Sequence, residues 1–283
     1  MDYLEYYGLK EPPFSNVVDN KFYYNSLQHR DSLVKLKYAI DSKKGLAVVI
    51  GDIGAGKTTL ARRLLEDLDE DGYEAILLVI VHSSVSSEWL LRKFAIQMGV
   101  TDIKDDKVEM LGQLYRRLLE INESGKTAVL LMDEVQMLKS REIMEEFRGL
   151  LNMEMPGGKM INLVFFGLSD LEEVLSLDEP LRQRVAMKIT LRPFSEDDMR
   201  EYIKHRLGIA GSGRPLFSEG ACGEIFKYSN GIPRLINTIC DNALLEGYLF
   251  KADIIDESVV KAVAIDLGLD RTGQVGKVPD NDK

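Results

Sequence analysis

The sequence has no excess of positive charge, few cysteines and no long apolar run, and each of these features narrows the class of protein. Its net charge of −10 at pH 7 argues against a surface coated in basic residues for nonspecific DNA binding. The two cysteines, Cys222 and Cys240, lack metal-ligand spacing and lie in apolar helical contexts, which predicts buried free thiols in a reducing compartment. No apolar window approaches the length of a transmembrane span, and the first residues lack the basic start of a signal peptide. We therefore expect a cytoplasmic protein.

The most informative motif present is a glycine-rich loop at residues 51–58, Gly-Asp-Ile-Gly-Ala-Gly-Lys-Thr, which fills every fixed position of the phosphate-binding pattern G-x-x-x-x-G-K-[ST]. An apolar run at 46–50 precedes it and leucines at helical spacing in 59–68 follow it, which is the strand and helix context that the pattern requires. The glycines let backbone N–H groups converge on phosphate oxygens. Lys57 is expected to reach the β- and γ-phosphates of a nucleotide, and the Thr58 hydroxyl to bind Mg²⁺.

Apolar strand-like segments alternate with helical segments up to residue 194. Strands are expected at 46–50, 76–81, 128–132, 161–166 and 187–191, and helices at about 29–42, 57–69, 86–98, 107–123 and 140–152. This alternation predicts an α/β fold with a parallel five-stranded central sheet flanked by helices. Four further helices are expected at about 195–208, from Ser218 to before Gly231, at 233–249 and at 256–267, which together predict a small all-helical domain.

These segments divide the chain into four expected parts. Residues 1–30 form an ordered arm, residues 31–194 the α/β core, residues 195–268 the helical domain, and the polar residues 269–283 a disordered tail. The sequence shows no internal repeat.

A pair of acidic residues, Asp133 and Glu134, directly follows the apolar strand at 128–132. Two acids at this place also make an ordinary helix N-cap, but their pairing with a phosphate loop favours a catalytic role. Asp133 would then hold the Mg²⁺ shell opposite Thr58, and Glu134 would polarise the attacking water as general base.

Together these motifs resemble the AAA+ ATPases, P-loop NTPases whose α/β core is followed by a helical lid, and more narrowly the secretion-associated ExeA/GspA type. The segments that carry this resemblance are Tyr3-Leu4-Glu5-Tyr6-Tyr7-Gly8-Leu9-Lys10-Glu11-Pro12-Pro13-Phe14, Gln28-His29-Arg30, Asp133-Glu134-Val135-Gln136, Leu181-Arg182-Gln183-Arg184, Tyr202-Ile203-Lys204-His205-Arg206-Leu207 and Gly231-Ile232-Pro233-Arg234-Leu235-Ile236-Asn237. The phosphate loop identifies only the superfamily, whereas the first and last of these segments are more specific. The resemblance covers roughly residues 1–265.

The resemblance implies that ATP and Mg²⁺ are bound and that ATP is hydrolysed. Arg184 would be the arginine finger, acting on the γ-phosphate in a neighbouring subunit, with Arg182 as the alternative. Arg234, at the start of a lid helix, would be the sensor 2 residue of its own subunit. The residues expected to contact the nucleotide are Gly51, Asp52, Ile53, Gly54, Ala55, Gly56, Lys57, Thr58, Thr59 and Arg234, and the arm would bring one or two of Phe22, Tyr23, Tyr24, His29 and Arg30 near the adenine.

Two positions depart from the family pattern. Leu168 replaces the glutamine expected after the fourth strand, so sensor 1 is expected to be Ser169 or to be weakened. His82 replaces an asparagine that can restrain the catalytic glutamate in this family. Two interpretations of His82 are open: a hydrogen bond to Glu134, or a strand-end residue that faces solvent.

The expected protein is an ATP-hydrolysing AAA+ ring or filament of identical chains, with active sites between subunits. The resemblance implies a role in assembling a secretion system, pilus or exported polymer. One alternative is a DNA-associated regulator like the TnsC/TniB transposition ATPases, for which locally placed lysines would suffice. Another alternative is a nucleotide-gated scaffold with weak turnover, which the changed sensor 1 would allow.

Overall fold

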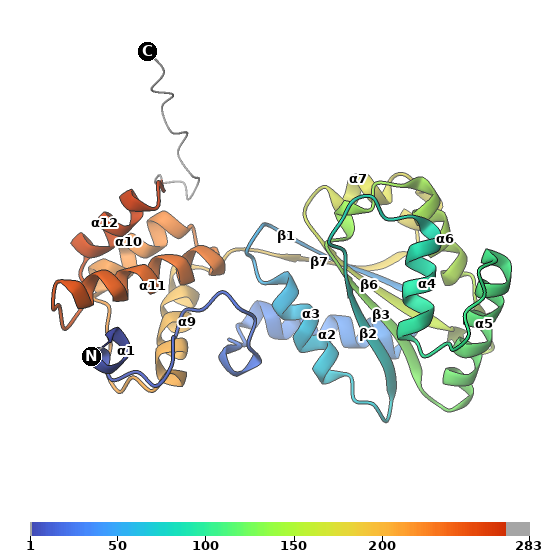
Figure 1. Cartoon of the computed structure of the whole chain (residues 1–283), viewed down its shortest axis with the longest axis horizontal. Helices are drawn as coiled ribbons and strands as arrows, with labels where there is room; N and C mark the ends of the chain where they lie inside the picture. Colours follow the sequence, from blue (N-terminus) through green and yellow to red (C-terminus); the bar gives the residue numbers. More distant parts are fainter. Residues whose placement is uncertain (1, 270–283) are drawn as a thin grey trace, which may run out of the picture. The chain divides into compact units, whose positions relative to one another are not determined.

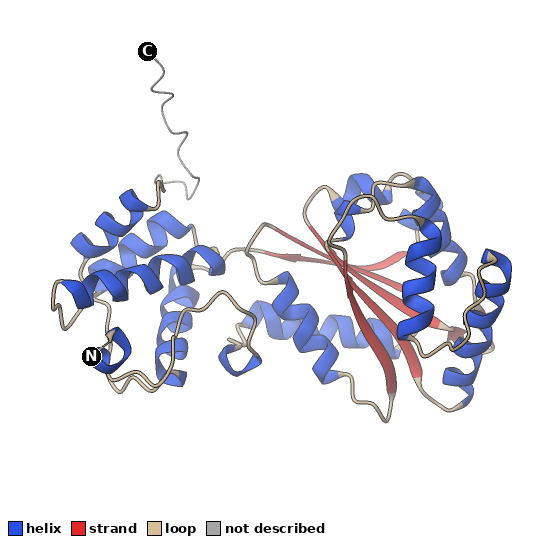
Figure 2. Ribbon diagram, viewed as in Figure 1, coloured by secondary structure: helices blue, strands red, loops and turns tan. Residues whose placement is uncertain are grey.

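The computed structural model describes residues 2–269, which form two compact units (Figure 1). An α/β unit is made of residues 27–53 and 57–191, and a helical unit of residues 2–26, 54–56 and 192–269. All the strands of both sheets lie in the α/β unit (Figure 2). The disordered tail expected at 269–283 lies outside the described residues from residue 270 onward.

The α/β unit is built around five parallel strands in the order β2-β3-β6-β1-β7. They are β1 (Leu46–Gly51), β2 (Tyr73–Val79), β3 (Thr127–Asp133), β6 (Ile161–Gly167) and β7 (Val185–Leu191). The three inner strands are apolar and almost wholly buried, as expected where helices cover both faces of a parallel sheet. The predicted parallel five-stranded sheet is confirmed.

Helices cover both faces of this sheet. On one face lie α2 (Leu27–Asp41) and α3 (Lys57–Asp67), and on the other α4 (Ser87–Gln97), α5 (Lys107–Glu123) and α6 (Arg141–Leu151) (Figure 1). Shorter elements complete the unit: η2 (Val135–Met137), the hairpin strands β4 (Glu154–Met155) and β5 (Gly158–Lys159), α7 (Leu171–Leu175) and α8 (Glu179–Arg182). The shorter elements were not predicted from the sequence.

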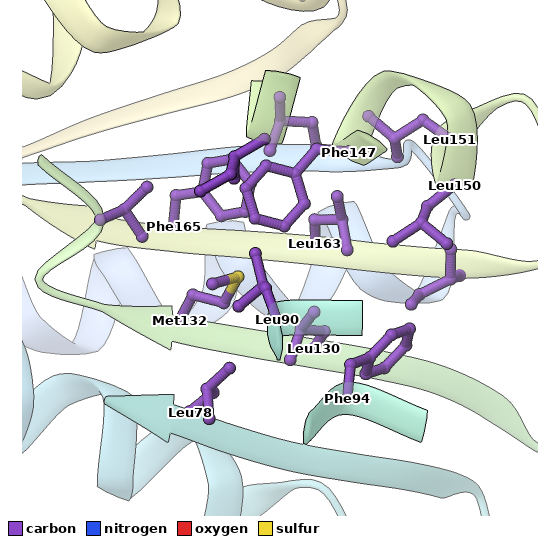
Figure 3. Packing of buried hydrophobic residues seen from close by; sticks show 14 of the residues in the cluster. Leu78, Leu90, Phe94, Leu130, Met132, Phe147, Leu150, Leu151, Leu163 and Phe165 are labelled. Atoms are coloured by element: carbon purple, nitrogen blue, oxygen red, sulfur yellow. The ribbon is translucent and has the colours of Figure 1, made fainter. Parts of the chain in front are cut away.

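The larger hydrophobic core lies between the sheet and helices α4 to α6 (Figure 3). Four strands, β1, β2, β3 and β6, present side chains to this core. The side chains that meet there include Leu78, Leu130, Met132, Leu163 and Phe165 from the sheet, Leu90 and Phe94 from α4, and Phe147, Leu150 and Leu151 from α6. The rings of Phe147 and Phe165 lie with their centroids 4.9 Å apart. Each large side chain buried in this way contributes about 1.5–3 kcal/mol, so this core fixes the strands whose carboxyl ends carry the site.

The helical unit contains four long helices and two short ones. They are α1 (Tyr3–Tyr7), η1 (Asn20–Phe22), α9 (Glu196–Ile209), α10 (Glu219–Ser229), α11 (Pro233–Leu249) and α12 (Glu257–Asp266). Gly231, between α10 and α11, has a φ angle of +73°, and a Cβ there would lie 2.0 Å from the carbonyl oxygen of Phe194. Only glycine fits this close approach, in which the Phe194 N–H also donates to the Gly231 carbonyl at 2.8 Å.

The amino-terminal arm packs on α9 through a buried arginine. The Arg206 guanidinium donates to the carbonyl oxygens of Pro13 and Ser15 and lies over the Phe22 ring, 4.9 Å from its centroid. Tyr24 packs against aromatic residues of the same helix. Phe22 and Tyr24 therefore belong to the core of the helical unit, and the expected contact of the arm with adenine stays a prediction.

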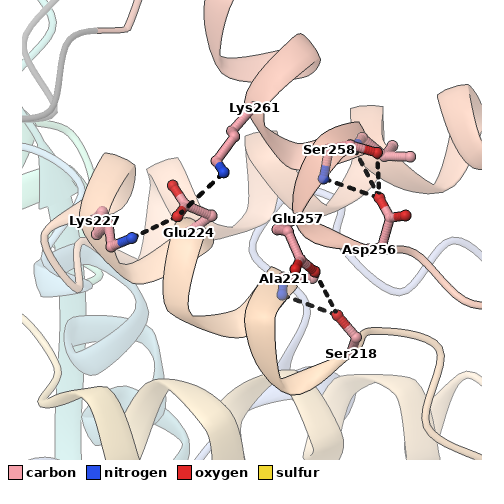
Figure 4. A network of polar contacts seen from close by, with 9 residues as sticks. Ser218, Ala221, Glu224, Lys227, Asp256, Glu257, Ser258 and Lys261 are labelled. Carbon is pink, nitrogen blue, oxygen red and sulfur yellow. Dashed lines mark hydrogen bonds and ion pairs between the residues drawn. The ribbon is translucent and has the colours of Figure 1, made fainter.

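A side-chain cap holds the amino end of α12 (Figure 4). The Asp256 carboxylate accepts hydrogen bonds from the hydroxyl and amide of Ser258 at 2.6 and 2.9 Å, and from the amide of Val259 at 3.2 Å. The Ser258 hydroxyl, and after it these amides, lower the pKa of Asp256 because they favour the charged carboxylate. The cap thus links the start of α12 to the ionisation of one side chain.

We expect Asp256→Ala to lower the free energy of unfolding by about 1 kcal/mol at pH 7, whereas Asp256→Asn retains a capping oxygen and costs less. The pKa of Asp256 is lower in the folded state, so its stabilising contribution is present above the unfolded value of about 3.9 and is lost as pH falls through the folded pKa. Urea denaturation of the three proteins at pH 7 and at a pH of about 3 or below measures both effects. Equal stability of Asp256→Ala and the parent at pH 7 would contradict the prediction.

Candidate nucleotide-binding and catalytic site

The phosphate loop leaves the carboxyl end of β1 and ends where α3 begins. Ile50 of β1 pairs with Gly167 of β6 and Thr190 of β7, so the loop starts at the edge where the parallel strands end. Gly54 and Gly56 have φ angles of +80° and +96°, a region that side chains rarely adopt. The loop therefore lies on the side of the sheet where open α/β folds bind their ligands.

Lys57, the first residue of α3, is only 6% exposed. Its ammonium donates to the carbonyl oxygens of Gly51 at 2.8 Å and Asp52 at 3.0 Å. These partners compensate the buried charge, and a phosphate oxygen, being charged, would bind the ammonium more strongly. The cation also lies at the amino end of a helix, where free N–H groups favour an anion.

The structure brings together Thr58, from the phosphate loop, and Asp133, from the acidic pair at the end of β3. The Thr58 hydroxyl donates to the Asp133 carboxylate at 2.5 Å, and Asp133, the last residue of β3, is 1% exposed. Burial raises the pKa of Asp133, whereas the bonds from Thr58 and from the Glu134 amide act in the opposite direction.

These two residues fit a magnesium ion. A carboxylate and a hydroxyl oxygen in contact are a donor set that Mg²⁺ takes from proteins, with water and substrate phosphate oxygens completing its shell. Within residues 2–269, no cluster of three or more His, Cys, Asp or Glu side chains offers another metal site.

Glu134 has an unusual backbone conformation for a residue with a side chain. Its φ and ψ angles are 61° and 33°, in the left-handed region, where a non-glycine residue is strained by about 1 kcal/mol or more. Its half-buried carboxylate accepts a hydrogen bond from the side-chain amide of Gln136 at 2.5 Å, and its backbone N–H donates to Asp133 at 2.9 Å. Strained residues of this kind cluster at active sites.

Gln136 is a site residue that the sequence reasoning missed. It was part of the motif Asp133-Glu134-Val135-Gln136, but no local pattern indicated that its side chain would bond both to Glu134 and to the backbone N–H of Leu168, at 3.2 Å. The only available signal was its place two residues after the expected general base.

Ser169 and His82, the two expected sensing residues, are both exposed. Ser169 follows β6 by two residues, at the same edge of the sheet as the phosphate loop, and its role as sensor 1 stays a prediction. His82 follows β2, and within the described part of the chain no hydrogen bond joins it to Glu134. Of the two interpretations of His82, the solvent-facing one describes this structure.

Arg184 and Arg182 lie at the opposite end of the sheet from the phosphate loop of their own chain. Both precede β7, whose first residue, Val185, pairs with Leu46 at the amino end of β1. The length of β1, six residues at about 3.3 Å each, therefore separates them from the loop. The Arg184 guanidinium donates to the Asn152 side chain. The Arg182 guanidinium donates two hydrogen bonds, at 2.6 and 2.8 Å, to the carboxylate of Glu179 in α8.

The remaining expected contact residues are placed as follows. Asp52 and Ile53 are exposed in the loop, Ala55 is buried, and Thr59 is half-buried in the first turn of α3. Arg234 is exposed, is the second residue of α11 and follows Pro233 at the helix start, in the helical unit. Its action as sensor 2 stays a prediction.

Comparisons with known proteins agree with this fold. A family model described as an AAA domain matches residues 40–175. Cdc6p from Pyrobaculum aerophilum has a similar structure, with a TM-score of 0.68 and 21% identity over 90% of this chain and 70% of that one. The RuvB Holliday junction branch migration motor from Thermotoga maritima matches with a TM-score of 0.60 and 18% identity over 90% of this chain and 76% of that one. The family match assigns residues 40–175 to an AAA domain, and the solved structures show the same fold over 90% of the chain.

A relative with a known name makes this assignment more specific. General secretion pathway protein A from Aeromonas hydrophila is 34% identical to this chain over 251 residues, which are 87% of this chain and 45% of that protein. This similarity confirms the resemblance to the ExeA/GspA type, and the chain spans about half the length of that relative. Separately, none of the helices in residues 2–269 combines the length and apolarity needed to cross a bilayer.

Proposed function

We propose that the protein binds ATP with Mg²⁺ at the phosphate loop and hydrolyses it. The observation that supports this most strongly is the 2.5 Å contact between Thr58 and Asp133, which are 75 residues apart in the sequence. Lys57 is buried in the same loop, and Glu134 follows Asp133 directly. A phosphate cradle, a magnesium-type donor pair and a candidate base are the parts that phosphoryl transfer to water needs.

Each residue has a distinct task in this reaction. The Lys57 ammonium would exchange its two carbonyl partners for β- and γ-phosphate oxygens, and Thr58 and Asp133 would hold the metal ion. Bound Mg²⁺ neutralises charge on the phosphate oxygens. The Glu134 carboxylate orients the attacking water and accepts its proton as the bond to phosphorus forms. Because the carboxylate is half-buried, fewer competing waters weaken this contact.

The reaction is completed by a second copy of the chain. Arg184 lies at the amino end of β7, the length of β1 away from its own phosphate loop, so it is suited to reach the loop of a neighbour. Its guanidinium would stabilise negative charge that develops on the γ-phosphate. The active form is therefore a head-to-tail ring or filament of identical subunits.

The biological process we infer is the assembly of a secretion system, or of a related pilus or exported polymer, from the cytoplasm. The support for this is the similarity to General secretion pathway protein A, whose name refers to secretion. The part of the chain aligned with that relative includes the whole candidate site.

The direct test is nucleotide binding by Lys57→Ala. Removing the ammonium takes away the charged donor that the phosphate loop itself offers, so the affinity for Mg²⁺–ATP is expected to fall by a factor of about 10–100 or more. Isothermal titration calorimetry measures the affinity, and Lys35→Ala, at an exposed lysine of α2, serves as the matched control. Unchanged ATP affinity in Lys57→Ala would overturn the proposed function.

A further inference from the structure

The side chain of Gln136 connects Glu134 to the segment that follows β6. Gln136 lies in η2 and is 6% exposed. Its amide nitrogen donates to the Glu134 carboxylate at 2.5 Å, and its amide oxygen accepts from the Leu168 N–H at 3.2 Å. One buried amide therefore bridges the expected general base and the residue immediately before Ser169.

The orientation of this amide is set by its two partners. The backbone N–H of Leu168 can only donate, and the ionised carboxylate of Glu134 can only accept. Turning the amide of Gln136 by half a rotation would face nitrogen to N–H and oxygen to carboxylate, and both hydrogen bonds would be lost. Only one orientation of the Gln136 amide satisfies both partners, so the amide holds the Glu134 carboxylate at a fixed distance and direction from the Leu168 backbone.

The end of β6 is shaped to admit this bridge. A Cβ on Gly167 would lie 2.8 Å from the Gln136 amide oxygen and 2.9 Å from the Leu171 side chain. Gly167 also pairs with Ile50, the residue before the last one of β1. The bridge thus lies at the edge of the sheet where the phosphate loop begins.

The bridge determines how the Glu134 carboxylate is presented. Within residues 2–269, Gln136 is the one hydrogen-bond donor to this carboxylate, and it engages oxygen Oε2. The backbone of Glu134 lies in the left-handed region, which also restricts the direction in which its side chain leaves the backbone. The other oxygen, Oε1, is left to accept a proton from water.

We propose that Gln136 is a positioning residue for hydrolysis: it orients the Glu134 carboxylate and ties it to the Leu168–Ser169 segment. This proposal rests on the ATPase function inferred above. It also gives the structure a restraint on Glu134 that is independent of His82, which is exposed.

Two substitutions test the bridge. Gln136→Met keeps the length of the side chain and removes both hydrogen bonds, whereas Gln136→Glu keeps the acceptor for Leu168 and replaces the donor with an oxygen that repels Glu134. We expect kcat to fall about tenfold to a hundredfold in both variants, with KM for ATP within about twofold of the parent. Gln97→Met, at an exposed glutamine that ends α4, is the matched control and should leave kcat unchanged.

The background of Glu134→Gln separates positioning from a general loss of structure. In that background Gln136→Met is expected to lower the single-turnover rate no further, because the group that it orients no longer takes the proton. A merely structural role would lower the rate by the same factor in both backgrounds and would overturn the inference. So would unchanged or faster turnover in both Gln136 variants. Parent-rate hydrolysis by Glu134→Gln would also overturn the inference, because Glu134 would then not be the general base. If the parent protein itself hydrolyses no ATP, the proposed function fails, which is a different result.

Discussion

Replacing Glu134 with glutamine is expected to lower ATP turnover by a factor of about 10²–10⁴ while leaving ATP affinity unchanged. The amide has the shape of the carboxylate, and its oxygen still accepts the hydrogen bond from Gln136, so the local structure is retained. It cannot take a proton from the attacking water, so the loss falls on the chemical step. Steady-state phosphate release and ATP titration, carried out on the same preparation, measure the two quantities.

The control for this substitution is Glu70→Gln, at an exposed glutamate in the turn after α3. It makes the same chemical change away from the site, so its turnover should equal that of the parent. Parent-like turnover in Glu134→Gln would remove Glu134 from the reaction and with it the assignment of the general base.

The second large effect is expected from Arg184→Ala, which should lower turnover by a factor of about 10³ or more with little change in ATP affinity. The guanidinium acts on charge that exists mainly in the transition state, so its removal leaves ground-state binding intact. The matched control is Asn152→Ala, which removes the intrachain partner of Arg184 and keeps the guanidinium. Arg182→Ala, which breaks the pair on α8, tests the alternative finger.

Mixing two inactive variants shows whether the site is shared between chains. Lys57→Ala lacks the phosphate contact, and Arg184→Ala lacks the finger. An interface is intact, however, when an Arg184→Ala chain supplies the phosphate loop and a Lys57→Ala chain supplies the finger. In an equal mixture about one interface in four is of this kind, so up to about a quarter of the parent rate should return. No recovery, in a mixture shown by light scattering to assemble, would place Arg184 outside the active site.

Much of the fold is predictable because its signals are local. The bounds of α5 and α11 agree with the expected 107–123 and 233–249, since Asp106 and Pro233 start these helices sharply. The strand expected at 76–81 is in fact Tyr73–Val79. Its extent is set by pairing with β3, from Tyr73 opposite Thr127 to Val79 opposite Asp133, and this pairing depends on residues far away in the sequence.

In the site, too, the contacts that depend on residues far apart in the sequence were the harder ones to predict. The contact of Thr58 with Asp133 was expected because each lies in a motif with a known spatial context. The bond between Gln136 and Leu168 joins residues that are 32 positions apart, and it requires the left-handed turn at Glu134 and the missing Cβ at Gly167. Neither condition has a sequence signal of its own. For His82, β2 ends at Val79, so the histidine lies beyond the strand in an exposed loop.

The separation of Arg184 from its own phosphate loop by the length of β1 has a consequence for how rate depends on assembly size. Each chain offers a loop at one end of its sheet and a finger at the other, so in an open filament the terminal loop has no finger. A filament of n chains would hold n − 1 complete sites, whereas a closed ring of n chains would hold n. Turnover per chain would therefore rise with length in the first case and stay constant in the second, which allows kinetics to distinguish the two architectures.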